Sequence, residues 1–110
     1  MASDHESALP IYSKEEARAI FQRSVKDGSV IFTKESRKRM RERHFRADGD
    51  NEDTNDLLKL AHTGIVAKEP EPHIKTGALI YRMESQKTTA QASFEIIDVK
   101  RIRLLTVMKD

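Results

Sequence analysis

The spacing of apolar residues predicts that the chain begins with a helix. Four apolar residues recur at the positions of one helix face: Ala17, Ile20, Phe21 and Val25. The preceding segment Ser13-Lys-Glu-Glu16 has the form of a capping box, in which the serine hydroxyl and the glutamate each satisfy a free backbone N–H group. Gly28 follows where a helix would end in a left-handed residue. The pattern therefore predicts a first helix over residues 14–27.

A second helix is predicted over residues 34–45, after a short apolar segment at 29–32 and with Thr33 as its N-cap. Its only large apolar residues are Met40 and the terminal Phe45. A helix with so thin an apolar stripe buries little and exposes a broad polar face. Here that face is cationic.

Residues 46–55 are polar and acidic, and we expect them to form a loop. The alternating acids in this loop resemble a calcium loop, but the required glycine and distal glutamate are absent. A third, short helix is predicted over residues 56–62, with Gly64 ending it. We expect neither a metal nor a cofactor in this protein.

The second half of the chain changes to an alternation of period two, which is typical of strands. The alternating apolar positions are Leu79, Tyr81 and Met83, then Phe94 and Ile96, then Ile102, Leu104, Thr106 and Met108. Leu105 and Val107 fall on the opposite face of the last strand, so we expect that strand to be central. Lys100 and Arg101 lie at a predicted hairpin between the last two strands.

This order predicts an α+β fold, with two to three N-terminal helices on one face of an antiparallel sheet of three to four strands. At 110 residues, the chain is long enough for one small domain. We expect a flexible N-terminus over 1–12 and a single domain over 13–110.

Composition excludes several classes of protein. The sequence has no cysteine, which rules out disulfides and thiol chemistry. No apolar run approaches the roughly 18 residues of a membrane span. The first residues lack the basic and apolar regions of a signal peptide. We therefore expect a cytoplasmic protein that does not bind membranes.

The formal net charge of +2 conceals a strong segregation of charge. Residues 34–46 hold seven Lys or Arg against two Glu, a net charge of +5. Residues 47–56 hold five acids and no base, a net charge of −5, and residues 100–110 carry +3. The acidic block could dock on the basic one, both could be solvated surfaces, or the basic face could be free for RNA or another anionic partner.

The basic helix also carries a family resemblance. Arg39, Met40 and Arg43 fall on the R-M-x-x-R part of the signature H-A-x-x-R-M-x-x-R, which is found in a family of small, poorly characterised bacterial domains. The later positions that match in order are Leu57, Leu60, Gly64, Tyr81, Arg82, Thr106 and Val107. Over residues 14–108 the chain thus resembles this family, which is similar to RelE-like and barnase-like folds.

The resemblance implies a RelE-like toxin ribonuclease that cleaves RNA without a metal, or a diverged relative, with a cognate antitoxin or another protein as possible partner. Glu35 and Ser36 stand here where the signature has His and Ala, and about seven extra, acidic residues precede Leu57. Such cleavage needs a base, an acid and cations that stabilise the charge developing on the phosphate.

The candidate catalytic residues are Glu35, Arg39, Arg43 and Arg82. The first three fall four residues apart, on one line of the helix, as a carboxylate base beside two phosphate-binding guanidinium groups. The same spacing equally fits a surface salt bridge. Arg82 adjoins Tyr81 on a strand, and since neighbouring strand residues point to opposite faces, we expect Tyr81 in the core and Arg82 opposite.

The candidate RNA-binding residues are Arg37, Lys38, Arg41 and Arg46. His44 could turn toward this cationic face and act as the acid, although its position does not require that role. Most aromatic residues fall on apolar stripes and are assigned to the core, so we expect no base-stacking platform. Three hypotheses remain open: a ribonuclease, a non-catalytic module that binds RNA through the basic helix, and a protein-interaction module that uses the two charge blocks.

Overall fold

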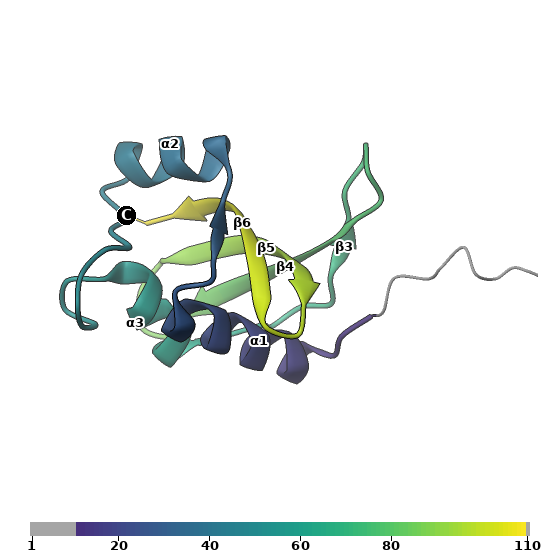
Figure 1. Cartoon of the computed structure of the whole chain (residues 1–110), viewed down its shortest axis with the longest axis horizontal. Coiled ribbons are helices and arrows are strands. Elements are labelled where there is room, and N and C mark those ends of the chain that lie inside the picture. The colour runs from purple at the N-terminus through teal and green to yellow at the C-terminus, as the bar shows by residue number, and fades with distance from the viewer. Residues whose placement is uncertain (1–10, 110) are drawn as a thin grey trace, which may run out of the picture.

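The computed structural model describes residues 11–109 and confirms the α+β class. The helices are α1 (Lys14–Asp27), α2 (Lys34–Glu42) and α3 (Asp56–Thr63). The strands are β1 (Ile31–Phe32), β2 (Gly64–Ile65), β3 (Glu71–Pro72), β4 (Leu79–Ser85), β5 (Gln91–Asp98) and β6 (Arg101–Met108). In the view of Figure 1, the strands run between α2 above and α1 with α3 below. Most of the expected flexible N-terminus lies outside the described residues.

Helix α1 forms where the sequence predicts it because both of its ends are specified locally. The Ser13 hydroxyl accepts a hydrogen bond from the Glu16 backbone, and the Glu16 carboxylate accepts one from the Ser13 backbone. Gly28 ends the helix with a φ of 68°, a left-handed conformation that costs glycine little. The capping box and the glycine stop are thus both confirmed.

The sheet has more strands than the alternation predicts, and it is mixed rather than antiparallel. The strand order is β1-β6-β5-β4-β2, with β3 also paired to β4. Strand β1 runs parallel to β6, and the other pairs are antiparallel. The prediction of three to four strands is wrong because β1, β2 and β3 have two residues each, too few to show any alternation. Strand β6 is central, as predicted.

A β-bulge changes which residues of β6 face the core. Phe94 pairs with Leu104, whereas the preceding Ser93 pairs with Thr106, so Leu105 is an extra residue. The bulge reverses the alternation beyond it, and Val107 is therefore buried while Met108 is half-exposed. The expectation that Thr106 and Met108 continue the face of Ile102 and Leu104 is wrong for this reason.

The core lies between the sheet and the pair formed by α1 and α3. Its largest fully buried side chains include Phe21 of α1, Leu60 of α3, and Tyr81 and Phe94 of the sheet. The ring of Phe94 lies 4.9 Å from that of Phe21 and 5.8 Å from that of Tyr81. Tyr81 is buried and Arg82 is exposed, as the strand parity predicts.

Helix α2 packs along β6 and ends three residues earlier than predicted. Its N-cap is Thr33, as expected, and the buried Ser36 completes a capping box with it. At the other end, His44 donates its backbone N–H to Arg41 and Phe45 donates to Met40. With His44 at a φ of 52°, these bonds form a Schellman motif. This turn ends the helix and directs Phe45 into the core.

Candidate functional site

Successive residues of an α-helix turn by about 100°, so the residues of α2 fall on four sides of the helix. The inner side carries Ser36, Met40 and Arg43. One flank carries Glu35, Arg39 and Glu42, and the opposite flank carries Arg37 and Arg41. Lys34 and Lys38 lie on the outer side and are exposed. The predicted catalytic and RNA-binding residues of this helix therefore face different ways.

The flank with Glu35 forms a charge cluster within the helix. Arg39 Nε lies 2.7 Å from a Glu35 carboxylate oxygen, and Arg39 Nη1 lies 3.0 Å from a Glu42 carboxylate oxygen. The hydrogen bond to Glu35, then the one to Glu42, raises the pKa of Arg39. Both carboxylates are already bound to this guanidinium, so the cluster has the geometry of a surface salt bridge. Whether it also takes part in catalysis stays a prediction.

Arg43 bonds to the backbone of the sheet. Its Nη1 donates to the Val107 carbonyl oxygen at 2.9 Å, and its side chain is half-buried against β6. The Lys109 ammonium adds a second tie by donating to the His44 carbonyl oxygen at 3.0 Å. These two bonds fasten the end of α2 to the C-terminal strand. Arg43 therefore serves as an anchor in this structure, and a role in phosphate binding stays a prediction.

Arg82 lies apart from the other predicted catalytic residues. It is exposed on β4, where it lines a small pocket with Lys68, Glu69, Glu71 and Ile80. Two strand spacings separate β4 from β6, the strand on which α2 packs. The structure thus does not bring Arg82 into one cleft with Glu35, Arg39 and Arg43.

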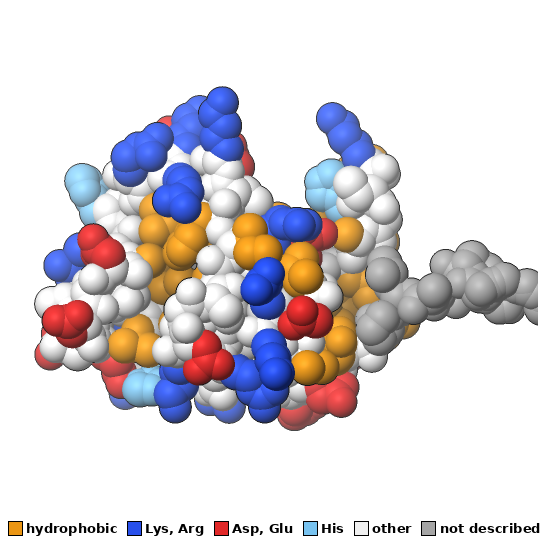
Figure 2. Space-filling model, viewed as in Figure 1, with side chains coloured by type: hydrophobic (Ala, Val, Ile, Leu, Met, Phe, Trp, Pro, Cys, Tyr) orange, Lys and Arg blue, Asp and Glu red, His pale blue; other side chains and the backbone are white. Residues whose placement is uncertain are grey.

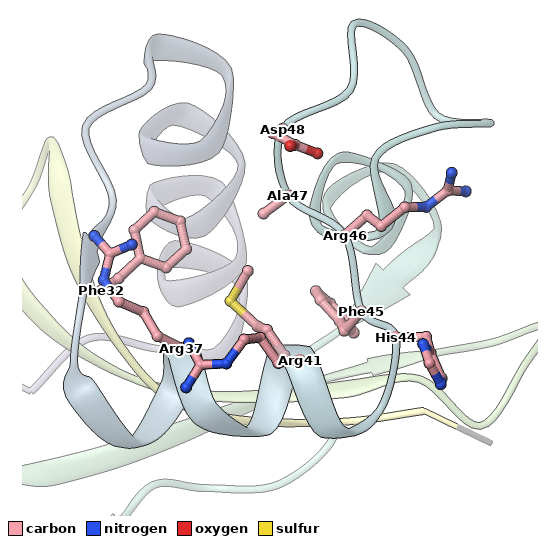
Figure 3. A pocket seen from close by; sticks show the side chains of 9 residues that line it. Phe32, Arg37, Arg41, His44, Phe45, Arg46, Ala47 and Asp48 are labelled. Carbon is pink, nitrogen blue, oxygen red and sulfur yellow. The ribbon is translucent and has the colours of Figure 1, made fainter.

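Unlike the predicted catalytic residues, most of the predicted RNA-binding residues converge on one pocket. This pocket lies beside α2, and we call it the basic pocket. Its lining residues are Phe32, Arg37, Met40, Arg41, His44, Phe45, Arg46, Ala47 and Asp48. Its volume is about 540 Å³. Three of the four predicted residues line it, and Lys38 lies on the adjoining outer side of the helix. Figure 3 shows these side chains between α2, β1 and the segment that follows the helix.

The basic pocket combines an apolar floor with a cationic rim. Phe32, Met40, Phe45 and Ala47 supply apolar surface, and all four also pack against the core. In Figure 2 this apolar surface is exposed directly below the blue side chains that cover α2. Arg37 and Arg41 on the rim have no ion pair within residues 11–109, in contrast to Arg39. The pocket can therefore hold an apolar or aromatic group while its rim binds an anion.

Phe32 is a candidate site residue that the sequence pattern did not indicate. The Arg37 guanidinium lies over its ring, 5.1 Å from the centroid, in a cation–π contact. This contact orients the arginine and leaves the rest of the pocket open. Phe32 is partly buried and packs against the core, as expected for most of the aromatic residues, but it also lines the pocket. The spacing from Phe32 to Arg37, across a helix N-cap, gave no recognisable signal in the sequence.

His44 lies on the rim of the basic pocket in a position that normally favours glycine. Its backbone has a φ of 52°, and Figure 3 shows its ring directed outward from the pocket. Arg46 also borders the pocket, but its Nη2 donates to the Asp53 carbonyl oxygen at 3.1 Å. Both residues line the pocket, but their side chains do not point toward its centre.

The acidic segment does not neutralise the basic pocket. Glu52 pairs with His62 of α3, and Asp56 pairs with Lys109 at 3.1 Å. Within residues 11–109, no acid of the 46–55 segment forms an ion pair with α2. Asp48 is the one acid that lines the pocket. Of the alternatives left open by the sequence, the structure therefore disfavours an acidic block docked on the basic helix.

Comparison of the chain with protein-family models, with curated proteins and with solved structures found no match. The resemblance to RelE-like domains therefore stays a prediction. Across residues 11–109, no cluster of side chains could hold a metal ion. The same residues contain no helix that is long and apolar enough to cross a membrane. What defines the candidate site is a cationic pocket with an aromatic residue in its wall, on a small α+β domain.

Proposed function

We propose that this chain binds single-stranded RNA at the basic pocket, as a RelE-like domain or a diverged relative of one. One observation carries the proposal: Arg37 and Arg41 lack a carboxylate partner within the described residues and border an open, partly aromatic pocket. Guanidinium groups suit phosphate because their planar fork binds two oxygens at once. A base inserted below them would contact Phe32 and Met40.

Single-stranded nucleic acid fits this site better than a duplex. Proteins that bind single-stranded nucleic acid combine a cationic surface for the backbone with aromatic side chains for the bases. A base of a duplex is already stacked and paired, so it could not enter the pocket without being extruded. The short α2 is also not preceded by the helix of a helix-turn-helix motif, since α1 is separated from it by β1.

Fluorescence anisotropy with a labelled single-stranded RNA of about twelve nucleotides tests the proposal. We expect Arg37→Ala and Arg41→Ala each to weaken binding by about tenfold and to lower the salt slope by about 0.7, the value for one phosphate contact. Lys26→Ala is the matched control, because it removes the same charge from the exposed end of α1. Equal affinities for all three variants would overturn the proposal.

Cleavage of the bound RNA is the second candidate function, and the position of His44 favours it. His44 lines the same pocket as Arg37 and Arg41. An imidazole is the side chain most often used for proton transfer at neutral pH. Glu35, by contrast, lies on the far flank of α2 and is paired with Arg39. If the chain cleaves RNA at the basic pocket, His44 is therefore better placed than Glu35 to carry a proton.

Incubation of purified protein with total RNA and EDTA separates these roles. Loss of cleavage in His44→Ala but not in Glu35→Gln would place the reaction at the basic pocket. Loss in Glu35→Gln and Arg39→Ala, with folding intact, would place it on the other flank of α2. Intact RNA in every lane, together with binding in the anisotropy assay, would leave the chain a non-catalytic RNA-binding domain.

A further inference from the structure

We infer that RNA bound at the basic pocket continues across the molecule to a second contact, the tip of the β3–β4 hairpin at residues 73–77. This inference rests on the proposed function and extends it from a pocket to a path. Figure 1 shows the hairpin projecting on the same side of the sheet as α2. Figure 2 shows a hollow between the two, with Lys or Arg side chains at both edges.

The hairpin tip presents a cation, an apolar side chain and a ring within three residues. Lys75 is the one Lys or Arg between residues 71 and 78 and is exposed, with no ion pair within the described part of the chain. Ile74 is 100 % exposed, and His73 is exposed beside it. A phosphate could bind the ammonium while a base packs on the isoleucine or the imidazole. These are the same two kinds of contact that the basic pocket offers.

The tip is held in shape by its own backbone. The His73 backbone N–H donates to the Ala78 carbonyl oxygen at 2.7 Å, and the Gly77 N–H donates to the His73 carbonyl oxygen at 2.8 Å. Gly77 has a φ of 73°, which the tight turn requires. The Lys75 backbone N–H donates to His73 Nδ1 at 3.1 Å and fixes the ring. Because the turn is ordered in advance, contact with RNA there orders few further groups.

The surface between the two contacts does not oppose an anionic strand. Strands β6 and β5 lie between α2 and β4, from which the hairpin rises. On these strands Arg103 pairs with Glu95 at 2.7 Å. At the base of the hairpin, Glu69 and Glu71 line a pocket together with Lys68 and Arg82, so acids and bases are balanced there as well. Since neighbouring strands lie about 4.8 Å apart, β6 and β4 are separated by about 10 Å. The path from the basic pocket to the hairpin tip is longer than this, because the pocket is lined by Phe32 of β1, on the other side of β6, so only an RNA of several nucleotides can reach both contacts.

The inference predicts that hairpin variants affect long RNA alone. We expect the double variant Ile74→Ser with Lys75→Ala to weaken binding of an RNA of about twelve nucleotides by about three- to tenfold. Its affinity for an RNA of about three nucleotides should match that of wild type. Arg37→Ala should weaken both RNAs. Lys87→Ala, in the turn at the other end of β4, is the charge-matched control and should weaken neither.

The possible outcomes distinguish a failure of the second contact from a failure of the proposed function. If the hairpin variant binds the longer RNA as tightly as Lys87→Ala does, the second contact is overturned and the pocket stands. If Arg37→Ala has no effect on either RNA, the proposed function itself fails. If a poly-glutamate of equal length binds with the same dependence on Lys75, the surface recognises acidic protein rather than RNA, and the inference is overturned as well.

Discussion

At the scale of single residues, His44 and Ser36 shape the two ends of α2. His44 occupies the left-handed position of a Schellman motif, where glycine is the common choice. Ser36 is buried, and its hydroxyl both accepts from the Thr33 N–H and donates to the Thr33 carbonyl oxygen. The buried hydroxyl of Ser36 is thus fully paired within the first turn of α2.

The conformation of His44 predicts a gain of stability on substitution by glycine. A left-handed backbone costs a residue with a Cβ atom roughly 1 kcal/mol, and glycine avoids this cost. We expect His44→Gly to raise the free energy of unfolding in urea by about 1 kcal/mol. His44→Ala retains the Cβ atom and serves as the control, with no such gain. A loss of stability in His44→Gly would show that the imidazole itself stabilises the turn.

Tyr81 predicts a pH dependence that can be observed directly. Its hydroxyl donates to the Tyr12 carbonyl oxygen at 2.9 Å and accepts from the Tyr12 N–H at 3.0 Å. Burial raises the pKa of Tyr81 above 10.0, although the bond with Tyr12 opposes the shift. The folded chain therefore holds this proton more tightly than the unfolded chain. Its contribution to stability is complete below pH 10 and falls as the pH rises further.

Titration of tyrosine absorbance tests this assignment, because the sequence has two tyrosines. We expect one of them to ionise above pH 10 and that phase to be absent in Tyr81→Phe. At neutral pH, Tyr81→Phe should lower the free energy of unfolding by about 1 kcal/mol through its lost hydrogen bonds. That difference from wild type should narrow above pH 10. A constant difference would contradict the pKa shift.

At the scale of elements, α2 divides its charge between a neutralised flank and an open one. Arg39 is held by two carboxylates, whereas Arg37 contacts an aromatic ring and Arg41 has no partner within residues 11–109. The same helix therefore offers cations on one flank and shields them on the other. This division, rather than the total charge of the helix, decides where an anion can bind.

Neutralising the carboxylates should convert the shielded flank into a binding surface. We expect Glu35→Gln with Glu42→Gln to raise the affinity for single-stranded RNA by about threefold to tenfold, since Arg39 is then released and two negative charges are removed. Glu15→Gln with Glu16→Gln on α1 changes the net charge equally and is the control. Anisotropy at several salt concentrations measures both. A lower affinity in the α2 variant would favour a direct role for Glu35.

At the scale of the whole molecule, the C-terminal strand determines where α2 and its pocket lie. Arg43 bonds to Val107, and Lys109 joins the end of α2 to Asp56 at the start of α3. The parallel pair of β1 with β6 fixes the other end of the helix. The basic pocket forms in the space that these ties leave between α2, β1 and the 45–48 segment.

The anchoring role of Arg43 predicts a loss of stability rather than a selective loss of RNA binding. We expect Arg43→Met, which keeps the apolar stem, to lower the free energy of unfolding by about 1.5 to 3 kcal/mol. Below its melting temperature, the variant should bind RNA within about twofold of wild type, because Arg43 does not line the pocket. Thermal unfolding and anisotropy test the two parts. Unchanged stability with strongly reduced binding would instead assign Arg43 to the RNA.

The sequence by itself determined the features that depend on neighbouring residues. The capping box at Ser13, the N-cap at Thr33, the glycine stop at Gly28 and the alternation at Tyr81 and Met83 each arise within a few residues, so they could be predicted. The segregation of basic and acidic charge was also evident. These features located the cationic helix and most of its candidate RNA-binding residues.

Only the tertiary structure decided which of those cations are available. The salt bridges of Arg39 follow from helical spacing, but the bond from Arg43 to Val107 spans 64 residues and depends on the packing of α2 on β6. The bulge at Leu105 and the two-residue strands likewise arise from pairing with distant segments, which a local pattern does not encode. For the same reason, the role of Phe32 as a pocket wall emerged only once α2, β1 and the segment after the helix were brought together.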